Sequence, residues 1–169
     1  MTAQGEARGG AQSGWRQRPD GQPHELLVVE DNLPDVELTR RCLKQLGIPV
    51  NLRHVETAED ALAYLRRQGG YAAAARPDLI LLDLNLPGMS GLELLIEIRC
   101  DPALVALSVV MFTTSNNPHD LYRCLSHGCS SYVVKPRNYE DMVDVMHRML
   151  DYWLNVASLP PPPPPSHGK

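Results

Sequence analysis

The amino-acid sequence predicts an α/β fold, namely a doubly wound five-stranded parallel sheet in the order 2-1-3-4-5 with helices on both faces. Three observations predict it. Short aliphatic runs alternate with segments of helical pattern, as in a chain of βα units. Most of these runs are continuously apolar, which is typical of strands covered on both faces. Right-handed crossovers limit the remaining topologies, although other strand orders stay open at this point.

The half of the domain before residue 69 holds two strands and two helices. In chain order they are Leu26–Val29, Pro34–Leu46, Val50–Val55 and Thr57–Gln68. The first strand is an uninterrupted aliphatic run, and the second alternates apolar and polar residues. Pro34 suits the first turn of a helix and Gly47 suits its end. The pattern Thr57-Ala58-Glu59-Asp60 matches a capping box, which opens the next helix.

The half after residue 69 continues with three strands and three helices. In chain order they are Leu79–Leu82, Leu92–Arg99, Leu107–Phe112, Asn117–Gly128, Tyr132–Val134 and Asn138–Ala157. Gly69-Gly70 makes the connection into this half, and Pro87-Gly88 turns the chain after its first strand. Asn117-Pro118 caps one helix, and Asn138 opens the last.

Composition and length indicate one domain, from residue 24 to 157, between two tails. Residues 1–23 lack periodicity and are expected to be a disordered tail, and residues 158–169 form a Pro-rich tail. The net charge of −4 gives no reason to expect nucleic acid as a partner. No apolar run approaches the roughly 18 residues of a membrane span, and no secretory signal is visible. We therefore expect a cytoplasmic protein without a membrane partner.

The four cysteines and six histidines give little support for a zinc site or a disulfide framework. The sequence contains no Cys-x-x-Cys pair and no pair of histidines four residues apart, which are the usual spacings of such sites. We interpret the cysteines as reduced, partly buried thiols.

Polar residues with complementary chemistry follow four of the expected strands. These are Glu30-Asp31, Asp83, Thr113-Thr114 and Lys135. The carboxyl ends of parallel strands meet at one edge of a sheet, where ligands bind. Three carboxylates at one place repel one another, which is tolerable only if they share a cation or if some of them are protonated. Oxygen ligands favour Mg²⁺ or Mn²⁺, and a carboxylate beside such an ion, a lysine and a hydroxyl is equipped to accept a phosphoryl group.

These residues occur in the order of a known family. The acid pair Glu30-Asp31, the segment Asp83-Leu-Asn-Leu-Pro-Gly-Met-Ser-Gly91, then Thr113, Tyr132 and Lys135-Pro136 together resemble a CheY-like response regulator receiver domain. The likeness extends over about residues 25–157. The pattern Val-Glu-Asp-Asn-x-x-Asp further resembles the stand-alone response regulators that serve bacterial phytochrome histidine kinases.

The resemblance implies a role for each residue. Asp83 would accept the phosphoryl group from a histidine of a sensor kinase, and Glu30, Asp31 and Asp83 would hold Mg²⁺ together with the backbone carbonyl of Asn85. Thr113 and Lys135 would bind phosphate oxygens. Tyr132 would move inward as Thr113 moves, so that these two residues form the switch. On this interpretation the protein is no enzyme beyond its own phosphorylation and dephosphorylation.

Two other functions stay open from the residues alone. One is an interaction module of receiver shape that is never phosphorylated. The other is a phosphatase with an aspartate nucleophile, of the haloacid dehalogenase type. That class needs a second aspartate two positions after the nucleophile, and here the residue is Asn85.

The last expected helix predicts a homodimer. Taken as a regular α-helix from Met142 to Ala157, its apolar residues cover an arc of about 200°. A helix that lies on a sheet needs an apolar stripe of only about 100°. We expect the surplus surface, including part of Trp153 or Leu154, to bind a second copy. The alternative is that the N-terminal tail or the connection after Gly69 covers it.

Overall fold

The computed structural model describes residues 14–161, and their five strands form one parallel sheet. The strands are β1 (His24–Val29), β2 (Val50–Val55), β3 (Leu79–Leu82), β4 (Val109–Thr113) and β5 (Ser131–Val134). Their order is β2-β1-β3-β4-β5, and every neighbouring pair is parallel. The predicted fold class and strand order are therefore confirmed. The fourth strand begins two residues later than the apolar run of the sequence suggests.

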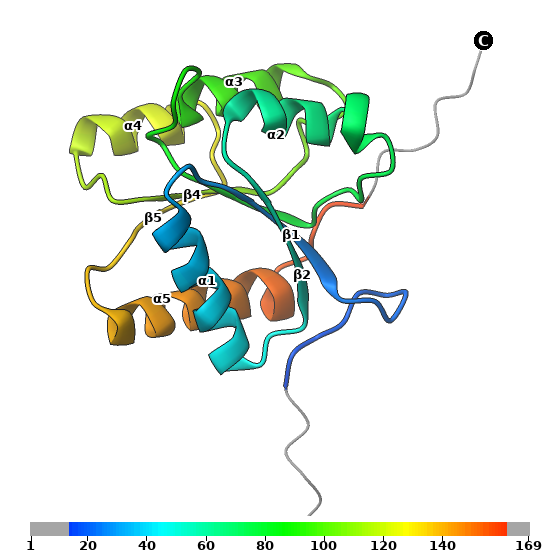
Figure 1. The fold of residues 1–169 in the computed structure, drawn as a ribbon, viewed down its shortest axis with the longest axis vertical. Coiled ribbons are helices and arrows are strands. Elements are labelled where there is room, and N and C mark those ends of the chain that lie inside the picture. Colours follow the sequence, from blue (N-terminus) through cyan, green and yellow to red (C-terminus); the bar gives the residue numbers. More distant parts are fainter. Residues whose placement is uncertain (1–13, 162–169) are drawn as a thin grey trace, which may run out of the picture.

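Helices cover both faces of the sheet. They are α1 (Leu33–Leu46), α2 (Ala58–Leu65), α3 (Gly91–Cys100), α4 (Pro118–Ser126) and α5 (Tyr139–Asp151), with a 3₁₀ turn η1 (Gly69–Tyr71) and a π-helical segment η2 (Tyr152–Val156). Helices α1 and α5 lie on one face, and α2, α3 and α4 lie on the other (Figure 1). Within the part of the chain described, no helix is both long and apolar enough to cross a membrane.

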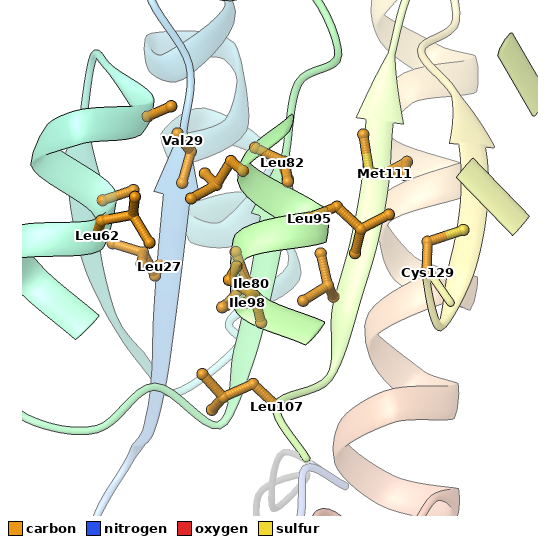
Figure 2. Packing of buried hydrophobic residues seen from close by; sticks show 14 of the residues in the cluster. Leu27, Val29, Leu62, Ile80, Leu82, Leu95, Ile98, Leu107, Met111 and Cys129 are labelled. Atoms are coloured by element: carbon orange, nitrogen blue, oxygen red, sulfur yellow. The ribbon is translucent and has the colours of Figure 1, made fainter. Parts of the chain in front are cut away.

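The core consists of two apolar layers, one on each face of the sheet. Because side chains of a strand alternate between faces, Leu27 and Val29 of β1 point to the α2 and α3 layer, and Leu26 and Val28 point to the α1 and α5 layer. Figure 2 shows the first layer, in which Leu27 and other strand residues meet side chains such as Leu62. Both layers are needed because β1, β3 and β4 are apolar on each face.

Helix caps place two helices at the edge where the functional residues lie. The side chain of Asn32 accepts a hydrogen bond from the backbone N–H of Asp35 and so begins α1 directly after the acid pair. The hydroxyl of Ser90 accepts one from the N–H of Glu93, whose carboxylate accepts the N–H of Ser90 in return. This capping box starts α3 immediately after the loop that follows Asp83.

The last helix differs from its expected form. The α-helix ends at Asp151, and residues 152–156 form a π-helical segment in which the N–H of Ala157 donates to the carbonyl of Tyr152. Asn155 of this segment accepts a hydrogen bond from the backbone N–H of Arg16, at 2.6 Å. A π-helical turn rotates the following side chains relative to a regular α-helix. The apolar arc of about 200°, which assumed a regular α-helix up to Ala157, therefore does not form.

Part of the expected N-terminal tail lies against the domain. The indole of Trp15 donates to the carbonyl of Leu46, and its ring packs edge-on against His147 of α5. Trp15 therefore contacts α1 and α5, in a segment that the sequence analysis expected to be disordered, whereas residues 1–13 lie outside the described residues. This contact is the alternative that the sequence analysis left open for the apolar surface of the last helix.

Candidate functional site

Three carboxylates converge at the carboxyl edge of the sheet. Glu30 follows β1 and Asp83 follows β3, and these strands are neighbours whose final residues, Val29 and Leu82, pair with each other. Oxygen atoms of Glu30, Asp31 and Asp83 all lie within 4.8 Å of one another. Glu30 and Asp83 are buried and Asp31 is exposed. The strand order predicted from the sequence thus brings together the three acids that it singled out.

Lys135 supplies the positive charge of the cluster. It follows β5, and its ammonium forms ion pairs with Glu30, with Asp35 at 2.9 Å and with Asp83 at 3.6 Å. Burial lowers the pKa of Lys135, but the negative charge of Asp83 and the hydrogen bonds that Lys135 donates to Glu30 and Asp35 outweigh it, so the pKa lies above its ordinary value. Lys135 is therefore a permanent cation in this site.

Burial raises the pKa of Glu30, against the opposing effect of Lys135, while the negative charge of Asp83 adds to the rise. One ammonium shared by Glu30, Asp35 and Asp83 leaves an excess of negative charge at this edge. That excess is the electrostatic condition for binding a divalent cation.

Gly91, the first residue of α3, lies directly behind Asp83. Its N–H donates to the carbonyl of Leu84 at 2.9 Å. A Cβ atom at this position would stand 2.0 Å from the carbonyl oxygen of Asp83 and 2.9 Å from the Cα of Leu84. The second glycine of the turn segment is therefore required by close packing of α3 against the strand end that carries Asp83.

Thr113 and Tyr132 lie on the neighbouring strands β4 and β5. Thr113 is fully buried, and its hydroxyl accepts the N–H of Ser115 at 3.3 Å. The ring of Tyr132 packs against the core, and its hydroxyl donates to the carbonyl of Ser115 at 2.9 Å. Both residues therefore contact the same residue of the β4–α4 loop, so a movement of that loop would reach both side chains.

Two functional neighbours were missed by sequence reasoning. The sequence pattern gives Asp35 no role in the site, yet its carboxylate contacts Lys135. The ring of His54 donates from Nε2 to the backbone carbonyl of Glu30 at 2.8 Å, since a carbonyl can only accept. The signal for Asp35 was its place in the first turn of a helix that begins at the acid pair. The signal for His54 was its place on the second strand. That strand lies beside the first, but only the strand order shows this.

The donor set fits a hard divalent cation. Three carboxylate oxygens lie within 4.8 Å of one another, and oxygen ligands of this kind suit Mg²⁺ or Mn²⁺. Asn85, the fourth expected ligand, lies in the same loop and its N–H contacts Asp83 Oδ1 at 3.4 Å. A bound cation would compete with the ammonium of Lys135 for Glu30 and Asp83.

The family model for the response regulator receiver domain matches residues 26–147. The chain belongs to this family. The match covers most of both core layers, all five strands except the start of β1, and every residue of the candidate site. The fold and the order of the site residues agree with that assignment, and the chain is a receiver domain rather than a classical enzyme.

Relatives of this receiver include regulators from light-sensing systems. It is 37% identical to the response regulator Rcp1 of Synechocystis over 138 residues, which cover 82% of this chain and 94% of that protein. Among solved structures, it resembles the phosphorylated cyanobacterial phytochrome response regulator RcpA, with a TM-score of 0.78 and 37% identity over 82% of this chain and 99% of the other. The Mn²⁺-bound form of Rcp1 gives a TM-score of 0.77, with 37% identity over 82% of this chain and all of the other.

Proposed function

We propose that Asp83 accepts a phosphoryl group from a phosphohistidine of a sensor kinase, and that the protein acts as a stand-alone response regulator. The observation that carries the proposal is the convergence of Glu30, Asp31 and Asp83 within 4.8 Å, beside the buried cation of Lys135. In the transfer, a carboxylate oxygen of Asp83 attacks phosphorus while the bond from phosphorus to the histidine nitrogen breaks. The freed imidazole leaves, and an acyl phosphate remains on Asp83.

The chain's own residues have distinct parts in this chemistry. Lys135 donates to an oxygen of the transferred group, and the hydroxyl of Thr113 donates to another. Glu30, Asp31, Asp83 and the carbonyl of Asn85 would hold Mg²⁺, or Mn²⁺ in its place. When bound, the ion neutralises charge that develops on the phosphoryl oxygens. The protein thus catalyses only its own phosphorylation and dephosphorylation.

The names of the relatives favour a bacterial phytochrome as the kinase, and we further propose that the protein acts in the cytoplasm. RcpA is a phytochrome response regulator by name, and a further solved relative, RPA3017 of R. palustris, acts in red light signaling; it is 30% identical with a TM-score of 0.78, over 82% of this chain and 99% of the other. We assign the receiver function to residues 24–157 and treat residues 1–23 and 158–169 as tails of that domain.

The direct test is incubation with acetyl phosphate and Mg²⁺, followed by measurement of the intact mass. We expect one added phosphoryl group, and none when the metal is chelated. An unlabelled protein under both conditions would favour the alternative of an interaction module that is not phosphorylated. Continuous hydrolysis of acetyl phosphate or of phosphate esters, faster than the label forms and decays, would favour the phosphatase.

Thr113→Ala is expected to separate phosphorylation from switching. The variant keeps Asp83 and Lys135, so it should still be labelled by acetyl phosphate. It loses the hydroxyl that would draw the β4–α4 loop toward the phosphoryl group, and with it the movement that reaches Tyr132. Chemical shifts of Ser115 and Tyr132 on phosphorylation should change in the wild type and in Thr113→Ser, and much less in Thr113→Ala. Equal shifts in all three proteins would exclude this coupling.

We also propose a homodimer through the C-terminal helix, at a smaller surface than the sequence suggested. Leu150 and Leu154 are buried within the chain's own core, so substitution of these residues would test folding rather than association. Tyr152 and Val156 are 54% and 66% exposed, and exposed apolar side chains of this size suit an interface.

The double variant Tyr152→Glu and Val156→Glu is expected to weaken association by about tenfold or more, because two charges would be buried at the interface. Sedimentation at micromolar concentration measures the effect. Tyr122→Glu is the control, since it changes an exposed tyrosine on α4. A monomeric wild type, or a dimer that the double variant leaves unchanged, would contradict this interface.

A further inference from the structure

Asp35 is a fourth carboxylate at the site, and its position is fixed by α1. Its backbone N–H donates to the side chain of Asn32, and its carbonyl accepts the hydroxyl of Thr39 at 3.0 Å. Its carboxylate lies 2.9 Å from the ammonium of Lys135, which follows β5 one hundred residues later. The side chain of Asp35 is 30% exposed, whereas that of Lys135 is 5% exposed. Asp35 therefore reaches inward from the surface to a buried cation.

The ammonium of Lys135 is surrounded by three carboxylates in this arrangement. It carries three N–H groups; it donates hydrogen bonds to Glu30 and Asp35 and forms an ion pair with Asp83 at 3.6 Å, which is beyond hydrogen-bond distance. A phosphoryl group on Asp83 needs at least one of these donors. A phosphoryl group that draws the ammonium toward Asp83 therefore competes with the carboxylates of Glu30 and Asp35, to which Lys135 now donates.

When a phosphoryl group competes for Lys135, the contact with Asp35 is the one that we expect to open. Glu30 belongs to the carboxylate cluster that suits a cation, and within the described residues Asp35 is outside that cluster. A phosphoryl group carries about 1.5 to 2 negative charges near neutral pH, and nearby carboxylates disfavour it. Asp35 is also partly exposed, so water can solvate its carboxylate once the ion pair opens.

We propose that Asp35 is a positioning residue: it holds Lys135 in the unphosphorylated site and competes with the phosphoryl group for the ammonium. It thereby lowers the phosphorylated fraction of the protein and ties the first turn of α1 to the state of Asp83. The inference rests on the proposed phosphorylation of Asp83 and adds a residue that regulates it.

The test compares the affinity for beryllium fluoride, an analogue of the phosphoryl group, at saturating Mg²⁺. Asp35→Asn keeps the size of the side chain and removes its charge, and we expect it to bind beryllium fluoride about three- to tenfold more tightly than the wild type. Asp35→Glu keeps the charge and should bind like the wild type. Glu37→Gln, which neutralises an exposed acid of the same helix, is the matched control and should also bind like the wild type.

The outcomes separate this inference from the proposed function. A wild type that neither binds beryllium fluoride nor is labelled by acetyl phosphate would overturn both. A wild type that binds, together with equal or weaker binding by Asp35→Asn, would overturn the competition alone. The competition would also be overturned if Glu37→Gln tightened binding as much as Asp35→Asn, because the effect would then come from the net charge of the protein. Melting temperatures of all variants, measured without metal, confirm that each protein is folded.

Discussion

Asp83→Asn is expected to abolish labelling by acetyl phosphate, with a loss on the order of 10³-fold or more. The amide nitrogen and oxygen of asparagine do not replace the carboxylate oxygen that attacks phosphorus. The variant should fold, because asparagine has nearly the same shape as aspartate and removes one of three neighbouring negative charges. Intact mass after incubation with acetyl phosphate and Mg²⁺ measures the effect.

Asp144→Asn serves as the control for this experiment. Asp144 lies on the exposed side of α5, where it pairs with Arg148 four residues later, and its substitution should leave labelling unchanged. If Asp83→Asn were labelled as fully as the wild type, the phosphoryl group would be on another residue and the assignment of the acceptor would be wrong.

Gly91→Ala is expected to cause the largest loss of stability among single methyl additions to the glycines of residues 14–161. The added carbon would stand 2.0 Å from the backbone oxygen of Asp83, and backbone atoms cannot rotate away as a flexible side chain can. Such overpacking costs about 3 kcal/mol or more, which lowers the melting temperature by about 10 °C in a chain of this size. Thermal unfolding measures the loss.

The same substitution should impair the site at temperatures where the protein is still folded. Relief of the clash must shift either α3 or the strand end that carries Asp83, so we expect slower labelling by acetyl phosphate as well. Gly70→Ala is the control, because a Cβ atom there meets no atom within 4 Å. A melting temperature of Gly91→Ala equal to that of Gly70→Ala would contradict the close packing of α3 against this strand end.

Much of the fold follows from local features of the sequence. The apolar runs of β1 and β3 are continuous, so both faces must be covered, and the caps at Asn32 and Thr57 start helices where the pattern places them. Because every strand is followed by a helix, the sheet is parallel, and the carboxyl ends of its strands share one edge. The three acids and Lys135 could therefore be assigned to one site before any coordinates.

The structure of the last helix could not be predicted from local features in the same way. Its sequence is apolar over a wide arc, but its final turn is π-helical, and Asn155 there bonds to the backbone of Arg16, from the other end of the chain. Trp15 packs against His147 on the preceding α-helix. A periodicity argument assumes a regular helix, and it contains no information on a segment that approaches from 139 residues away.

The sequence by itself predicted which side chains carry the chemistry and at which edge of the sheet they stand, and it favoured the strand order that the structure shows without excluding others. Only the tertiary structure decided that Asp35 holds Lys135, that Gly91 must lack a side chain and that Trp15 packs on α5. The reason is physical: strand ends are set by local pattern and by parallel pairing. Contacts between side chains far apart in sequence depend instead on how closely each helix packs on the sheet, and fractions of an ångström in that packing decide which atoms meet.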